Sequence, residues 1–433
     1  MGPHTDPLPH PGSSLETHVR PDSGRMYSDP NTTGEDLIDR LLERLEKSSF
    51  DTGKEFWPRG CFKEILTPEI ITDELAEDVD QIPLRALVDF ITRQCRRTFV
   101  IVLCCNFDGQ KLFRAMNYFM RLNFKDSDLP IVGDDNKRIF YSSTGKYRDP
   151  WSRLSVRSFK EYQWKTLAPV FSNRHPEVDL HGPQVLPFIW SSHRGSSGTF
   201  GDVHEVTIHP AHLDHVRSSR VCTQFISIAL ADMCIIDNQR ANVAIKKLHR
   251  AYTEDQPKMR ELEKEWQKEV QAHKEIAKCN HSNIIKFMTA ITRDYERYLM
   301  FEWANGGNLR EFWVEYSPRL TKSLVKDILL QLRGLADALE EIHSKGFRHG
   351  DMKPENILRI KTPGNDSAIG TLKICDMGLT KYHYLATQLR QQATDTSVFH
   401  HLFLTFYSCD HLESIMAVGR FDLVSCILPS CLC

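Results

Sequence analysis

The sequence has no excess of charge of either sign. Its 433 residues carry 55 Lys and Arg against 57 Asp and Glu. A chain without a basic surplus has no long-range field that would attract nucleic acid or an anionic membrane surface. We therefore expect neither nucleic acid nor a membrane among its partners, and any binding preference should come from local sites.

Paired cysteines and long apolar runs are also missing. The 12 cysteines are scattered, without the closely spaced pairs of a zinc site, which indicates reduced thiols and predicts a cytoplasmic or nuclear protein. The N-terminus lacks the charged start and apolar core of a secretory signal. The most apolar stretch, residues 221–237, contains Asp232 and is shorter than the roughly 20 residues of a membrane span.

The first part of the chain is predicted to be helical. Residues 1–34 are rich in Pro, Gly and Ser and are expected to form a disordered tail. Residues 35–130 carry apolar residues at the spacing of one helix face and predict a mostly helical module. We expect this module to bind a protein partner. Residues 131–185 are rich in turn formers and charge, which predicts a connecting region.

After Leu186 the pattern changes to short runs of β-branched and aromatic residues. These runs predict strands at 202–209, 242–248 and 298–303. A long charged helix is predicted over 257–279, and apolar spacing predicts another over 324–346. Strands followed by helices favour an α+β domain with two lobes.

A glycine-rich stretch, "GSSGTFGDV", precedes the predicted strands. Gly198 and Gly201 flank a turn, and main chain without a Cβ approaches phosphate oxygens closely enough for its N–H groups to donate to them. A glycine-rich turn that binds nothing would have the same sequence. The case for phosphate binding is strengthened by Lys246, which follows in "VAIKK". A buried strand lysine is unfavourable unless a phosphate or a carboxylate pairs with it.

The stretch "HGDMKPENIL", residues 349–358, combines three residue types at fixed spacing. Phosphoryl transfer needs a base beside the acceptor hydroxyl, a cation beside the moving phosphate, and oxygen ligands for Mg²⁺. Asp351, Lys353 and Asn356 are of these three types. Asp376 in "CDMG" adds an anionic ligand of the kind that Mg²⁺ prefers.

In this order the motifs resemble those of the eukaryotic protein kinase domain, over about residues 186–395. "QWKTLAPVF", "HGDMKPENIL" and "DMGLTK" are similar to stretches of the serine/threonine kinases of filamentous fungi. The resemblance implies ATP and Mg²⁺ as cofactors and a protein hydroxyl as the acceptor. It also implies a two-lobed α+β kinase-like domain, preceded here by the helical module.

The resemblance assigns roles to individual residues. Asp351 would be the catalytic base, Lys353 would neutralise the transferred phosphate, and Asn356 and Asp376 would hold Mg²⁺. The residues implied in ATP binding are Ser196, Gly198, Gly201, Val203, Ala244, Lys246, Glu269, Glu302 and Ala304.

Within this set, Lys246 would hold the α- and β-phosphates, with Glu269 as its carboxylate partner and Glu265 as the alternative. Glu302 and Ala304 would lie in the hinge that binds adenine.

Some positions depart from the family pattern. Ser196 stands where the family has its first loop glycine, and Met377 stands where it has Phe. No Ala-Pro-Glu sequence follows Gly378, so we expect an incomplete helical lobe and an atypical tail over 396–433. Residues 213–240 are expected to be an insertion.

Two other functions fit the same residues. One is a pseudokinase or interaction protein that binds ATP without phosphotransfer. The other is a kinase that acts on a small molecule.

Overall fold

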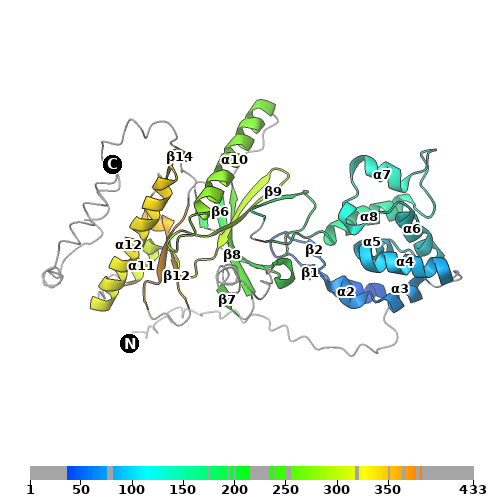
Figure 1. Ribbon diagram of the computed structural model, residues 1–433, viewed down its shortest axis with the longest axis horizontal. Helices are drawn as coiled ribbons and strands as arrows, with labels where there is room; N and C mark the ends of the chain where they lie inside the picture. The colour runs from blue at the N-terminus through cyan, green and yellow to red at the C-terminus, as the bar shows by residue number, and fades with distance from the viewer. Residues whose placement is uncertain are drawn as a thin grey trace, which may run out of the picture.

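The computed structural model of the protein describes residues 37–75, 81–172, 175–192, 196–198, 201–214, 235–237, 240–248, 255–316, 321–349, 352–362, 367–376 and 381–382 (Figure 1). The predicted tails, 1–34 and 396–433, and most of the predicted insertion lie outside the described residues. The helical module lies at one end of the molecule, a β-sheet lies in the middle, and α11 and α12 lie at the other end (Figure 1).

The helical module confirms the periodicity of its sequence. Its helices are α1 (Leu37–Leu42), α2 (Cys61–Ile65), α3 (Pro68–Leu75), α4 (Gln81–Gln94), α5 (Arg96–Leu103), α6 (Gly109–Arg121), α7 (Gly133–Phe140) and α8 (Arg153–Lys165). A short hairpin of β1 (Glu46–Lys47) and β2 (Glu55–Phe56) follows α1. Residues 98–103 of α5 are all buried, which makes this helix the centre of the module.

The region expected to be a connector is more ordered than its composition predicts. Residues 133–140 and 153–165 form α7 and α8, and the rings of Phe140, Trp151 and Phe159 pack in the same core as α5. The Phe140 and Trp151 ring centroids are 4.6 Å apart. The helical core therefore extends to α8, because buried aromatic rings outweigh the local preference of turn formers.

The central sheet has eight strands: β3 (Glu177–Leu180), β4 (Phe188–Ser191), β5 (Ser196–Gly198), β6 (Gly201–Ile208), β7 (Ile235–Asp237), β8 (Arg240–Leu248), β9 (Phe287–Arg293) and β10 (Glu296–Glu302). The strand order is β3-β9-β10-β8-β6-β4, with β5 paired to β6 and β7 paired to β8. All pairs are antiparallel except β3 with β9, so the sheet is mixed. The three predicted strands correspond to β6, β8 and β10.

The predicted charged helix is α10 (Gln256–Ala277), and it covers one face of the sheet. Trp266 and Val270 of α10 pack in one cluster with Ala290 and Leu299 of the sheet. Alternate residues point to the opposite face. There Tyr298 and its neighbours belong to a second cluster, described below.

The second lobe is built on α11 (Leu309–Tyr316) and α12 (Lys322–Ser344). The Thr321 hydroxyl accepts a hydrogen bond from the Leu324 amide and caps α12. Gly346 follows with a φ of +81°, as the predicted helix stop requires. The strands of this lobe are β11 (Phe347–Arg348), β12 (Ile357–Ile360), β13 (Thr371–Ile374) and β14 (Lys381–Tyr382).

Sheet and helices together confirm the α+β, kinase-like fold. In the described part of the chain, no helix has the length and apolarity needed to cross a membrane.

Candidate active site

Lys246 lies on the central strand β8 and faces the interior of the domain. It is paired in register with Val203 of β6 and with Leu299 of β10. Its Nζ is 2.6 Å from Oδ1 of Asp376, and the two side chains are 12% and 27% exposed. The strand lysine therefore has the carboxylate that its burial requires, and the pair joins residues from the two lobes.

Two segments of the second lobe fix the position of Asp376. The buried ring of His349 bonds through Nε2 to the carbonyl of Cys375 at 2.8 Å, and the Cys375 amide donates to the carbonyl of Asn356 at 2.9 Å. Asp376 itself has a φ of +60°, in the left-handed region that only a few residue types adopt readily. These contacts hold the "HGDMKPEN" and "CDMG" segments side by side.

The oxygen donors at this point suit a hard cation. Asp376 supplies a carboxylate and Asn356 supplies an amide oxygen. Mg²⁺ uses one or two protein oxygens and completes its shell with phosphates and water, so this donor set fits a magnesium ion that is bound together with a nucleotide. No group of three or more acidic, His or Cys ligands occurs among the described residues, so the residues present do not form a cage of protein ligands.

The glycine-rich stretch forms a hairpin. Ser196 pairs with Val203, and Gly198 pairs with Gly201, in the antiparallel ladder of β5 and β6. The residues at the tip, 199–200, lie outside the described part. Gly198 and Gly201 therefore lie opposite each other on the two strands, and the binding role of this stretch stays a prediction.

The predicted hinge begins at the end of β10. The Glu302 side chain is buried, accepts a hydrogen bond from the Lys286 amide at 2.7 Å and pairs with the buried Lys373 at 2.7 Å. Burial lowers the pKa of Lys373, and Glu302 opposes that shift. These contacts engage the Glu302 carboxylate with the second lobe. Ala304, two residues further on, is also buried.

Behind Lys246, α10 presents a buried histidine. The His273 ring stacks on Phe287 with centroids 5.4 Å apart and meets Phe301 edge-on at 5.2 Å. Burial, assisted by the charge of Lys246, lowers the pKa of His273 to about 4, so the ring is neutral at pH 7. On the same helix Glu269 is half-buried, whereas Glu265 is exposed. The pairing of Glu269 with Lys246 stays a prediction.

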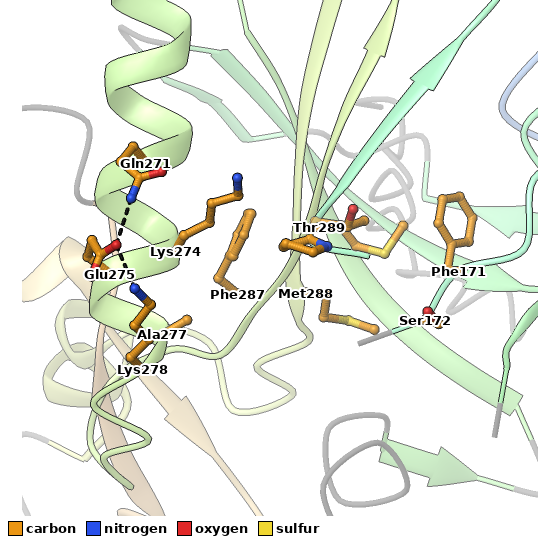
Figure 2. A pocket seen from close by; sticks show the side chains of 12 residues that line it. Phe171, Ser172, Gln271, Lys274, Glu275, Ala277, Lys278, Phe287, Met288 and Thr289 are labelled. Carbon is orange, nitrogen blue, oxygen red and sulfur yellow. Dashed lines mark hydrogen bonds and ion pairs between the residues drawn. The ribbon is translucent and has the colours of Figure 1, made fainter. Parts of the chain in front are cut away.

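A cavity of about 480 Å³ lies between α10 and β9 (Figure 2). Its lining includes Phe171, Lys274 and Phe287, and Lys274 also pairs with Glu177 of β3. None of the predicted site residues lines this cavity. It is therefore separate from the site around Lys246.

Some predicted residues cannot be placed. Asp351, the predicted base, lies outside the described residues, as do Met377 and Gly378. Lys353 is described, and its charge opposes the rise that burial causes in the pKa of the Cys375 thiol.

Sequence reasoning missed the structural roles of His349 and Lys373. His349 opens the quoted motif and could have been noticed there. Lys373 lies between the apolar Leu372 and Ile374, which are buried on β13, and a charged residue in such a position signals a buried partner.

Comparison with known proteins agrees with this geometry. Residues 228–400 match the family model of the protein kinase domain. This part of the chain is similar to a protein kinase domain. The match begins after the first strands of the sheet, so β3 to β6 and the helical module precede it.

Related proteins are serine/threonine kinases. The chain is 35% identical over 107 residues to the human serine/threonine-protein kinase DCLK3 and 33% identical over 111 residues to a probable myosin light chain kinase of Dictyostelium discoideum. Each of these alignments covers 25% of the chain, and they cover 15% and 20% of the relatives.

A longer alignment, 28% identical over 186 residues, joins the chain to serine/threonine-protein kinase 12 of Arabidopsis thaliana and covers 42% of the chain and 35% of that protein. The chain thus spans about a third or less of the length of these relatives.

Proposed function

We propose that the protein is a serine/threonine protein kinase that transfers the γ-phosphate of ATP to a protein hydroxyl. One observation carries the proposal. The Lys246 ammonium and the Asp376 carboxylate, 130 residues apart in sequence, meet at 2.6 Å between the lobes. A phosphate-binding lysine and a metal-binding carboxylate must both lie near the same phosphates if they are to act on one nucleotide, and this contact brings the two side chains together.

Each residue has one task in this proposal. Lys246 holds the α- and β-phosphates, the main chain of Glu302 and Ala304 faces adenine, and the hairpin at Gly198 and Gly201 covers the phosphates.

Asp376 and Asn356 hold Mg²⁺, which would offset charge on the phosphates. Asp351 accepts the proton of the acceptor hydroxyl, and Lys353 faces the phosphate in transfer.

Finer assignments belong to the same proposal. The motifs favour the kinases of filamentous fungi, and the scattered cysteines favour the cytoplasm or nucleus. The acceptor is a protein, and the helical module binds a further protein partner. The helical module precedes the residues that match the kinase family, so its surface is available to bind such a partner.

Transfer of labelled phosphate from ATP to a generic Ser/Thr-containing protein, with Mg²⁺ present, tests the proposal. Asp351→Asn should lower the transfer rate by about 100-fold or more, because a positioned base contributes about 10²–10⁴-fold. Asp149→Asn, in an exposed ion pair of the helical module, is the matched control and should leave the rate unchanged. Binding of ATP by the wild type without transfer would contradict the proposal, and so would full activity of Asp351→Asn.

A further inference from the structure

The face of the sheet opposite α10 is covered by residues that precede the kinase match. Phe171, Leu186 and Phe188 pack there on residues of the central strands. Phe50, from the hairpin that follows α1, meets the rings of Phe188 and Tyr298 at 5.6 and 5.9 Å. The hairpin of the helical module is therefore part of the wall of the ATP-binding lobe.

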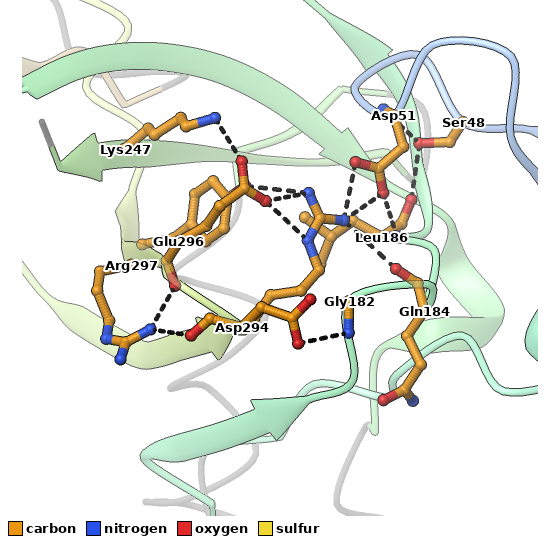
Figure 3. Close-up of polar contacts among 11 residues, drawn as sticks. Ser48, Asp51, Gly182, Gln184, Leu186, Lys247, Asp294, Glu296 and Arg297 are labelled. Carbon is orange, nitrogen blue, oxygen red and sulfur yellow. Dashed lines mark hydrogen bonds and ion pairs between the residues drawn. The ribbon is translucent and has the colours of Figure 1, made fainter. Parts of the chain in front are cut away.

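A buried ion pair fixes this hairpin to the sheet (Figure 3). Nη1 of Arg293, at the end of β9, donates to both carboxylate oxygens of Asp51 at 2.8 and 2.7 Å. The two side chains are 7% and 6% exposed. Asp51 also accepts a hydrogen bond from the Leu186 amide at 2.8 Å, and its own amide donates to the Ser48 hydroxyl at 3.1 Å.

The contacts continue from Arg293 to the central strand. Nη2 of Arg293 donates to Glu296 at 2.8 Å, and the other carboxylate oxygen of Glu296 is 2.6 Å from Nζ of Lys247 (Figure 3). Nη2 also donates to the Tyr298 hydroxyl at 3.0 Å. Glu296 therefore joins two cations, Arg293 and Lys247.

Lys247 is the neighbour of Lys246 on β8. Because successive strand residues point to opposite faces, a contact that holds Lys247 on the outer face orients Lys246 toward the interior. In the ladder of β8 and β10, Lys247 is paired with Tyr298 and Lys246 is paired with Leu299, so the two lysines lie on opposite faces of the sheet. The orientation of Lys246 thus depends on both faces of the strand.

We propose that Asp51 is a positioning residue for Lys246, which acts through Arg293, Glu296 and Lys247. Among the described residues, removal of Asp51 leaves the buried Arg293 with Glu296 as its remaining carboxylate partner (Figure 3). An uncompensated buried charge is strongly unfavourable, so Arg293 draws Glu296 away from Lys247 and the outer face of β8 loses its contact. Through the contacts from Asp51 to Lys247, the helical module controls nucleotide binding at Lys246. This part of the inference rests on the proposed kinase function.

Hydrogen exchange of the protein without nucleotide tests the coupling independently of catalysis. In Asp51→Asn, exchange of residues 240–248 should rise about tenfold, while exchange of α5 stays at the wild-type rate. Asp149→Asn makes the same chemical change in an exposed pair and should alter neither. Unchanged exchange at 240–248 in Asp51→Asn would overturn the proposal, even for a chain that never binds ATP.

Kinetics separate positioning from a general loss of structure. Asp51→Asn should raise the KM for ATP about tenfold and change kcat by less than about threefold, because ground-state binding of the phosphates is weakened most. If this variant fails to fold, Glu296→Gln, which weakens the contact with Lys247 and leaves Arg293 paired with Asp51, should show the same raised KM. A wild-type KM in either folded variant would overturn the proposal.

Discussion

The helical module and the lobe that carries the central sheet hold their charges differently. Most of the described ion pairs within the module lie at the surface, as in Arg114 with Asp149, whose side chains are 54% and 73% exposed. Three pairs that involve the central sheet are largely buried: Lys246 with Asp376, Arg293 with Asp51, and Lys373 with Glu302, whose side chains are 8% and 4% exposed. Buried charges interact strongly and need partners at close range, so these pairs fix the positions of their side chains in the lobe. The module, in contrast, is held together by apolar packing.

Breaking the Glu302–Lys373 pair should have the largest effect. Glu302→Ala leaves Lys373 buried without its carboxylate partner and removes the acceptor for the Lys286 amide. Loss of one partner of a buried pair typically lowers stability by about 3–5 kcal/mol. Urea denaturation of the whole protein measures this change.

The control for Glu302→Ala is a double variant, Glu302→Gln with Lys373→Met. It removes both charges and should recover most of the lost stability. Equal losses in the single and double variants would show that the buried charge is not the cause.

A smaller effect should come from His212, which joins the two regions. Its Nε2 accepts a hydrogen bond from the Arg59 amide at 3.1 Å, and its Nδ1 bonds to the Pro169 carbonyl at 2.8 Å. Both bonds need the neutral ring, since a protonated Nε2 cannot accept. Burial lowers the pKa of His212 from 6.5 to about 4, an effect that the neighbouring His209 reinforces.

Because the unfolded chain binds the proton more readily, the stabilisation is complete above about pH 6.5 and is lost as pH falls toward 4. This shift corresponds to at most about 3 kcal/mol. Urea denaturation at pH 7 and at pH 5 should show a greater loss of stability on acidification for the wild type than for His212→Asn. Identical losses in the two proteins would contradict this account.

The smallest effect should come from an exposed pair. Arg114→Ala removes the ion pair with Asp149 and should lower stability by no more than about 1 kcal/mol, because water and salt screen exposed charges. The midpoint of urea denaturation measures it. A loss as large as that of Glu302→Ala would remove the contrast between module and lobe.

The sequence predicted the parts of the fold that local pattern determines. Helix α10, helix α12 with its stop at Gly346, and the strands around Lys246 follow from periodicity and turn residues. Helices α7 and α8 were missed because their turn formers and charges hide the buried Phe140 and Phe159.

Prediction of the site had a similar limit. The motifs located Lys246, Asn356 and Asp376, which the fold brings together. The pair of Asp51 with Arg293 joins residues 242 positions apart and belongs to no motif, so only the folded chain shows it. The ion pair of Lys246 with Asp376 joins distant segments and was not predicted, whereas the predicted pairing of Lys246 with Glu269 on α10 stays a prediction.

The most direct test of the central claim asks whether ATP binds beside Lys246. An acyl-phosphate derivative of ATP transfers its acyl group to a lysine that lies close to the bound phosphates, and mass spectrometry identifies the labelled peptide. We expect labelling at Lys246 that excess ATP with Mg²⁺ prevents, and only background labelling of an exposed lysine of the helical module such as Lys63. Labelling of Lys246 no greater than that of Lys63, or unaffected by ATP, would contradict the account.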